Sequence, residues 1–402
     1  NPQTENVSLD KKYILNGITD TLLVSTGDNK FNNSVINGYE TAVIFDGTDS
    51  QLTLSGTIVN GGTDGASDTV KGSANRDTLT LQSGSIVNGN ISMEGGDDTF
   101  VIGSEVTING NIGMGDDNDT LTIEKGSIVN GTLDGGSGND ILNFNPETTR
   151  AFGNNEINVL HNISNFNSMN INTNVTLFEK TIEDDGTPTD LSITGAENIS
   201  IGAKGVLTLR IDASKKGVIG TPDDGKIIGH ALYGNDGEIT SIGGGKLLLA
   251  LNGAGNESII SFGTTKLDNS LVTGSGGTFD TTSKLHTIES IDGVNNEVKV
   301  VARWIIPEIF KYKQLNKIYH GILSVDELGN FNVDDDEKLT LFLDYLNNIY
   351  AGSPYSYSSE LSRKSAGMFR DIVTENIFRP ETNKWMIYGG LTHVDGGTKD
   401  TY

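Results

Sequence analysis

The sequence predicts a mainly β protein that winds into a right-handed parallel β-helix, a solenoid with coils of about 21 residues. Two repeated landmarks support this prediction. Asn-Gly pairs recur every 21 residues at Asn88, Asn109 and Asn130. An aspartate followed two residues later by a large apolar residue recurs with the same step, at Asp77, Asp98, Asp119 and Asp140 with Leu79, Phe100, Leu121 and Leu142. Two independent series with one period indicate a true internal repeat.

The residues within one repeat predict strands and not helices. Residues 119–123 and 127–129 are two short strand-like runs, divided from their neighbours by Asn-Gly and Gly-Gly turns. The alternation of threonine with Leu121 and Ile123 places these two apolar side chains on one face. One repeat cannot bury that face alone, whereas stacked repeats can. We therefore expect the four large apolar residues of the repeat to form one interior column, with the four aspartates aligned beside it.

Strand-like phrases extend well beyond the strict repeat. Residues 1–39 are interpreted as earlier, less regular coils, and residues 62–73 as a loop that bulges from the stack, because the phrases around Gly56 and Gly84 are 28 residues apart. After Phe144 strand phrases continue to residue 301. We assign residues 1–303 to the β-helix. The later phrases are residues 168–178, 191–194, 199–201, 206–211, 246–251, 258–262 and 298–301.

The apolar spacing becomes helical after residue 304. A first helix is predicted from about residue 305 to 323, with Pro307 in its first turn, and we expect it to cover the open end of the stack. Residues 339–350 predict a second helix and residues 358–379 a third, which Pro380 ends. Residues 385–391 read as an extended amphipathic strand. The domains are therefore 304–379, a helical cap with linker helices, and 380–402, a strand-forming segment.

Composition excludes several classes of function. The net charge of −25 disfavours binding to nucleic acid or to an anionic membrane by bulk electrostatics. The chain has no cysteine, so a disulfide framework or a thiolate site is ruled out. No run of 18 apolar residues is present, and the first residues are Asn1-Pro2-Gln3 with no signal sequence. We expect this sequence to be part of a longer exported protein.

Two passages near the end resemble the segment that precedes and opens the barrel in monomeric (type V) autotransporters, especially large fusobacterial-type adhesins. They are residues 349–365 (IYAGSPYSYSSELSRKS) and residues 383–402, which begin NKWMIYGGLTH. The resemblance implies export through the outer membrane by a C-terminal β-barrel, with the β-helix displayed outside. It also implies that residues 358–379 form the helix in the barrel pore and that Trp385 opens the first barrel strand. The rest of the barrel lies outside this sequence.

The repeat offers two candidate polar sites. Asn88, Asn109 and Asn130 are expected to form a stacked amide ladder, or to be turn residues in left-handed geometry, or both. The acidic turns around Asp98, Asp119 and Asp140 are either solvated or bind calcium, and residues 135–143 match the calcium-binding nonapeptide of β-rolls once. The step of 21 residues favours the solvated alternative, because β-rolls repeat the motif every nine residues.

Catalytic motifs are not found in the sequence. The histidines at positions 161, 230, 286, 320 and 393 are too widely spaced for a metal pair, and no Gly-x-Ser-x-Gly setting occurs. Arginine is scarce between Arg76 and Arg303, which disfavours a polysaccharide-cleaving cleft. Asn347-Asn348 lacks the acidic neighbours of a self-cleavage site and is interpreted as helix sequence. We predict no catalytic, cofactor-binding or metal-ligating residues, no cofactor, and a protein that is not an enzyme.

The functional expectation is an adhesin or display rod on the cell surface. Its expected partners are a host-cell or bacterial surface receptor, protein or glycan, and its own C-terminal outer-membrane β-barrel, with no nucleic acid. One alternative is a mechanical stalk and folding platform with the binding activity upstream. The other is a carbohydrate-active β-helix enzyme. Excursions near residues 62–73, 184–190 and 221–233 distinguish adhesion from a smooth stalk, since adhesion predicts exposed aromatic or polar loops.

Overall fold

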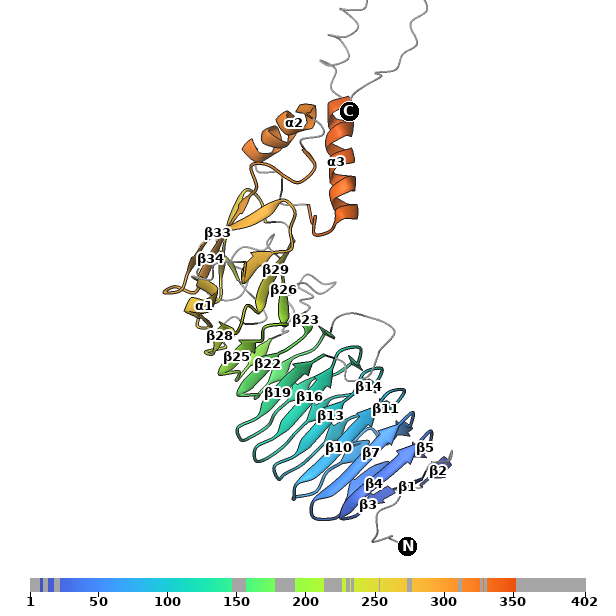
Figure 1. Ribbon diagram of the computed structural model, residues 1–402. Helices are drawn as coiled ribbons and strands as arrows, with labels where there is room; N and C mark the ends of the chain where they lie inside the picture. Colours follow the sequence, from blue (N-terminus) through green and yellow to red (C-terminus); the bar gives the residue numbers. More distant parts are fainter. Residues whose placement is uncertain are drawn as a thin grey trace, which may run out of the picture.

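The chain forms a rod of stacked coils with a small helical module at the C-terminal side (Figure 1). The computed structural model describes residues 8–9, 14–17, 22–146, 157–177, 192–212, 226–228, 232, 235–252, 254–272, 277–309, 313–325, 328 and 331–351. In the stacked coils, each strand pairs in parallel with the equivalent strand of the coil before or after it. This confirms the predicted mainly β, parallel solenoid. Residues 358–379 and 385–391 lie outside the described residues.

Three parallel sheets run along the first part of the rod. The long sheet contains, in order, β1 (Ser8–Leu9), β4 (Gly27–Asn32), β7 (Ser50–Ser55), β10 (Asp77–Gln82), β13 (Thr99–Ile102), β16 (Thr120–Glu124), β19 (Ile141–Asn145), β22 (Ser168–Ile171), β25 (Asn198–Ile201), β28 (Glu238–Ser241) and β31 (Lys266–Leu267). The second sheet contains β2 (Ile14–Asn16), β5 (Val35–Asn37), β8 (Ile58–Asn60), β11 (Ile86–Asn88), β14 (Thr107–Asn109) and β17 (Ile128–Val129). The third sheet contains β3 (Leu22–Val24), β6 (Val43–Phe45), β9 (Val70–Lys71), β12 (Ile91–Ser92), β15 (Ile112–Gly113), β18 (Leu133–Asp134), β21 (Ile163–Ser164) and β24 (Ile193–Thr194).

Each coil therefore has three strands and not the two that the sequence predicts. The missed strands belong to the third sheet and are mostly two residues long, too short for an alternating pattern to show. The bulging loop is confirmed: Thr63, Asp64, Gly65 and Ala66 are exposed, and β9 then rejoins the stack between β6 and β12.

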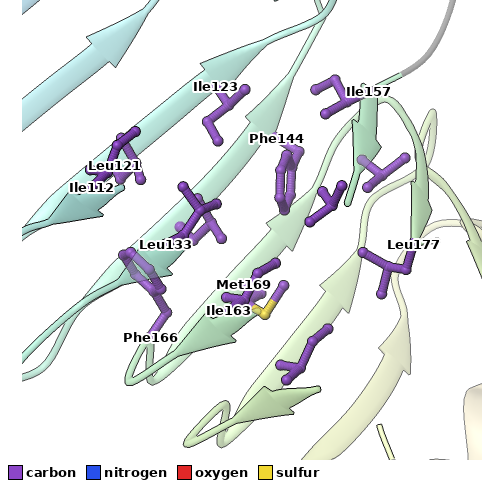
Figure 2. Packing of buried hydrophobic residues seen from close by; sticks show 14 of the residues in the cluster. Ile112, Leu121, Ile123, Leu133, Phe144, Ile157, Ile163, Phe166, Met169 and Leu177 are labelled. Atoms are coloured by element: carbon purple, nitrogen blue, oxygen red, sulfur yellow. The ribbon is translucent and has the colours of Figure 1, made fainter. Parts of the chain in front are cut away.

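A different sheet replaces the second one in the later coils. It consists of β20 (Ile157–Val159), β23 (Asn174–Leu177), β26 (Val206–Asp212), β29 (Lys246–Asn252) and β32 (Phe279–Thr281). Figure 2 shows how the interior continues across this change, since Ile157 and Leu177 belong to the same packed core as Leu121, Ile123 and Phe144.

The interior column predicted from the repeat is confirmed by the register. Leu79 pairs with Phe100, Phe100 with Leu121, and Leu121 with Leu142, and none of the four has any exposed surface. The alternation inside the long sheet sends Leu79 and Leu81 inward and the intervening threonines outward. Parallel strands lie about 4.8 Å apart, so each interior side chain rests directly on its counterpart in the next coil.

The parallel stack ends in a mixed sheet, in which β27 and β30 are parallel and the other pairs are antiparallel. This cap sheet has the order β27 (Ile227–Ile228), β30 (Glu257–Ser261), β34 (Glu297–Ala302) and β33 (His286–Asp292), and β34 is antiparallel to both of its neighbours. Residues 298–301 were expected to form another coil strand, and that prediction is wrong. Val298 and Val300 of β34 are fully buried against the solenoid core, and the adjacent helix α1 (Asn269–Val272) buries Leu271 there as well.

Two helices follow, α2 (Lys313–Ser324) and α3 (Asp336–Ala351). The second is where the sequence predicts it. The first begins later than predicted, and Pro307 lies in a turn before it. The helices bury Tyr319, Phe342 and Leu346 in a cluster separate from the solenoid core, so the prediction that a helix closes the stack is wrong. The mixed cap sheet covers that end. Within the described residues, no helix is both long and apolar enough to cross a membrane.

Candidate functional site

The four repeat aspartates form a hydrogen-bonded column at the start of the long-sheet strands. The backbone N–H of Asp77 donates to Oδ1 of Asp98 (2.7 Å), that of Asp98 to Asp119 (2.7 Å), and that of Asp119 to Asp140 (2.8 Å). All four side chains are at most 1% exposed. The column continues into the next coil with an amide, since the N–H of Asp140 donates to Oδ1 of Asn167 (2.9 Å). A neutral isostere therefore already occupies one position of this column.

The second oxygen of each carboxyl group is buried and has no hydrogen-bond partner in the described part of the chain. These atoms are Oδ1 of Asp77 and Oδ2 of Asp98, Asp119 and Asp140. Loss of water around an unpaired oxygen disfavours the charged form. Burial accordingly raises the pKa of all four groups, to about 8 for Asp98 and about 7 for Asp119, and neighbouring carboxylates add to the rise in these two. Asp98 is therefore mostly protonated at neutral pH, and Asp119 is close to half protonated.

A second, exposed ladder lies in the turns just before this column. The backbone N–H and Nδ2 of Asn118 both donate to Oδ1 of Asp97 (3.1 Å each), and the N–H of Asn139 donates to Oδ1 of Asn118 (3.1 Å). The bonds from Asn118 lower the pKa of Asp97. The prediction of solvated acidic turns thus holds for Asp97. It is wrong for Asp98, Asp119 and Asp140, which point into the wall of the coil.

The described residues contain no group of three or more His, Asp or Glu side chains placed to hold a metal ion together. In the segment that matches the calcium nonapeptide, Asp140 accepts a hydrogen bond from the backbone of the coil before it. Its carboxyl group is committed to the buried column and is not directed toward the acidic turn.

The predicted amide ladder is present and longer than the strict repeat. Nδ2 of each asparagine donates to Oδ1 of the one before it, at 2.7 or 2.8 Å, through Asn16, Asn37, Asn60, Asn88, Asn109 and Asn130. The left-handed alternative is wrong, because none of these six residues has a positive φ. The glycines after Asn109 and Asn130 are explained by close packing between coils and not by left-handed geometry. A Cβ at Gly110 would lie 2.2 Å from a carbonyl oxygen of the preceding coil, and one at Gly131 would lie 2.0 Å from such an oxygen.

One exposed aromatic side chain lies beside the bulging loop. Tyr39 is 57% exposed, and its carbonyl oxygen accepts hydrogen bonds from the backbone N–H (3.2 Å) and hydroxyl (2.8 Å) of Thr63. Asp64 closes the loop by accepting from Ser67. This loop is thus pinned next to an aromatic side chain, an arrangement suited to contact with another molecule. Sequence reasoning missed Tyr39 because it lies more than twenty residues before the loop.

A hollow of ≈ 400 Å³ with a mixed polar and apolar lining opens on the long sheet beside Gly103, whose missing side chain leaves a gap. Glu124 folds into this gap and is buried, with its Oε2 accepting from the backbone N–H (3.3 Å) and hydroxyl (3.2 Å) of Ser104. The rim carries Ser55, Gln82 and Ser83. The lining combines these hydroxyl, amide and carboxylate groups with the apolar side chains of Leu81 and Val101.

The described histidines have separate structural surroundings. His286 is buried in the cap: its Nε2 bonds to the carbonyl oxygen of Gly255 (2.8 Å) and its Nδ1 to the hydroxyl of Ser283 (2.8 Å). Burial lowers its pKa. His320 on α2 packs edge-on against Trp304, with ring centroids 3.8 Å apart. His161 is half-buried. Positions 230 and 393 lie outside the described residues.

These features define a class of protein: a capped parallel β-solenoid with a buried acidic column and an external amide ladder. No protein-family model, curated protein or solved structure matches the chain in comparison. The fold and its polar columns are therefore the basis for a functional conclusion.

Proposed function

We propose that this chain is the membrane-proximal passenger of a monomeric autotransporter, displayed at the cell surface as an adhesin or display rod. The observation that carries the proposal is the order of parts: a long capped solenoid, a helical module, and then residues 383–402, which resemble the opening of an outer-membrane barrel. A rod of this kind holds a binding surface away from the membrane, because each coil adds about 4.8 Å of length.

Adhesion is supported by the exposed surfaces on the early coils. Tyr39 and the loop around Asp64 form one exposed surface feature. The hollow beside Glu124 forms a second. The proposed partner is a protein or glycan on a host cell or another bacterium. The proposed anchor is the chain's own C-terminal barrel.

A mechanical stalk is the second candidate function. One outward row of the long sheet, outside the hollow, carries the short polar side chains of Thr78, Thr99 and Thr120, which leave that part of the face smooth. On this alternative the receptor is contacted upstream of Asn1, and these coils act as spacer and folding platform.

Display is tested with the complete protein in a Gram-negative host. An epitope inserted between Asp64 and Gly65, in the exposed loop, should be labelled by antibody on intact cells. Deletion of residues 385–391 should abolish labelling while the protein is still detected in lysed cells. Equal labelling of both proteins on intact cells would contradict the barrel assignment.

Adhesion is tested with the same cells. Tyr39→Ala combined with Glu124→Gln should lower binding to target cells while surface labelling is unchanged. Thr120→Ser, in the smooth outward row, is the matched control. If the double variant binds as well as the wild type, these coils do not contact the receptor, and the stalk function is favoured.

A further inference from the structure

Six of the seven Asn-Gly pairs in this sequence are rungs of the amide ladder. Asn-Gly is a chemically labile pair, because glycine has no side chain to shield its backbone nitrogen from the neighbouring amide carbon. That nitrogen attacks Cγ of the asparagine, the Cγ–Nδ2 bond breaks, and ammonia leaves with the proton that the backbone nitrogen has lost. Water then opens the resulting succinimide to aspartate or isoaspartate.

The early rungs have both reactants of this step held by hydrogen bonds. The attacking N–H of Gly38 donates to the carbonyl oxygen of Asn60 (2.8 Å), and that of Gly89 donates to Asn109 (3.0 Å). The side-chain amide of Asn88 is held on both sides, by Oδ1 of Asn60 (2.7 Å) and Nδ2 of Asn109 (2.8 Å). Reaction at these rungs requires local opening of the coil.

The last rung differs at both reacting groups. The side chain of Asn130 is exposed, and among the described residues it makes one ladder bond, which Nδ2 donates to Asn109 (2.8 Å). Within the described residues, the N–H of Gly131 has no hydrogen-bond partner. Gly131 also lines a small cavity of ≈ 10 Å³, close to the room that one water molecule needs. The attacking nitrogen and the amide that it attacks are therefore both less restrained at this rung than at Asn88.

We propose that Asn130 is a site of spontaneous deamidation in the folded protein, and that the ladder protects the earlier rungs. Conversion of Asn130 to a carboxylate removes the Nδ2 donor to Asn109 and places two acceptor oxygens against each other. The modification therefore detaches the last link of the ladder. Asn109 has an intermediate position, because its amide is bonded on both sides, while the N–H of Gly110 has no partner among the residues that the structure describes.

The sequence contains a matched control for this proposal. Residues 84–89 and residues 126–131 are the same hexapeptide, Gly-Ser-Ile-Val-Asn-Gly, so local sequence gives Asn88 and Asn130 the same intrinsic reactivity. Any difference between them in the folded protein comes from structure alone. The two asparagines also fall in different tryptic peptides, which are separated by cleavage after Lys125.

The experiment incubates the purified chain at pH 8 and 37 °C and follows the mass increase at each asparagine by peptide mass spectrometry. Asn130 should deamidate about tenfold faster than Asn88, which is the factor expected when one or two hydrogen bonds must break first. In urea the two rates should become equal. Equal rates in the folded protein, a faster rate at Asn88, or no reaction at either position while both react in urea would each overturn the proposal.

Discussion

Replacement of Asp98 by asparagine should remove much of the pH dependence of stability. Asp98 accepts the backbone N–H of Asp77 through Oδ1, and asparagine keeps this acceptor. Asn167 shows that an amide fits the column. Since burial raises the pKa of Asp98, the folded state binds its proton more tightly than the unfolded state does. The wild type should therefore lose stability as pH rises.

The size of this effect follows from the displacement of the pKa. The pKa rises from an ordinary value of 3.8 to about 8. Stability from this group is fully present below pH 3.8 and is lost progressively as pH approaches 8. A displacement of this size corresponds to about 5 kcal/mol at pH 8, at 1.36 kcal/mol for each pKa unit. Asp119 should contribute in the same direction over a similar window, because its pKa rises to about 7.

Urea unfolding followed by far-ultraviolet circular dichroism at pH 5, 6, 7 and 8 measures the effect. Asp98→Asn should be no more stable than the wild type at pH 5 and more stable at pH 8, so the two pH profiles cross. Asp97→Asn is the matched control, because Asp97 is the adjacent residue in the sequence and its side chain is exposed. Its profile should retain the wild-type decline between pH 5 and 8.

A parallel shift would refute this reasoning. If Asp98→Asn lowered the free energy of unfolding equally at pH 5 and pH 8, the carboxyl group would be ionised throughout, and the column would be stabilised by charge. The same conclusion would follow if wild-type stability increased from pH 5 to pH 8.

Three further predictions concern other parts of the molecule. Phe100→Ala should cost about 3–5 kcal/mol in urea unfolding, because Phe100 is fully buried in the interior column, whereas the outward Thr99→Ala should cost far less; similar losses would contradict the inward register. Because the pKa of His286 is lowered by burial, the cap should lose stability as pH falls through about 6.5, opposite in sign to the aspartate column. Amide exchange in β33 and β34, corrected for its intrinsic rate, should show lower protection at pH 5 than at pH 8. His286→Gln should abolish this difference in protection. If the difference remained in the variant, another group would be its cause. Adding calcium or a chelator should leave the melting temperature nearly constant, whereas a calcium-dependent rise would show that the acidic turns bind the ion.

The repeat made the regular coils predictable from sequence. One period relates Leu79, Phe100, Leu121 and Leu142, and their register follows because stacked parallel strands place equivalent residues side by side. The amide ladder was predictable for the same reason. The third strand of each coil was not, because two residues such as Ile91–Ser92 contain no period.

The state of the aspartates could not be read from their neighbours in sequence. Asp97 and Asp98 are adjacent and chemically identical, yet one is exposed and the other buried. Strand alternation turns successive side chains to opposite faces, and Asp98 lies in line with the inward Phe100. The sequence did contain an indication that these aspartates are buried. Each lies two residues before an inward apolar residue, and residues two apart in a strand lie on the same face. The antiparallel pairing in the cap left no such indication, because the sequence of β34 alternates as a parallel strand would.

The equivalence of successive coils bears on how such a protein changes length during evolution. Residues 77–97, 98–118 and 119–139 present the same interior to the coils on either side. Gain or loss of one whole coil therefore leaves every remaining contact with an acceptable neighbour and alters only the reach of the rod. Gain or loss of a single residue within a strand turns the side chains beyond it to the opposite face. Recombination between coils is thus tolerated in steps of 21 residues, and the length of the rod can change without a new core.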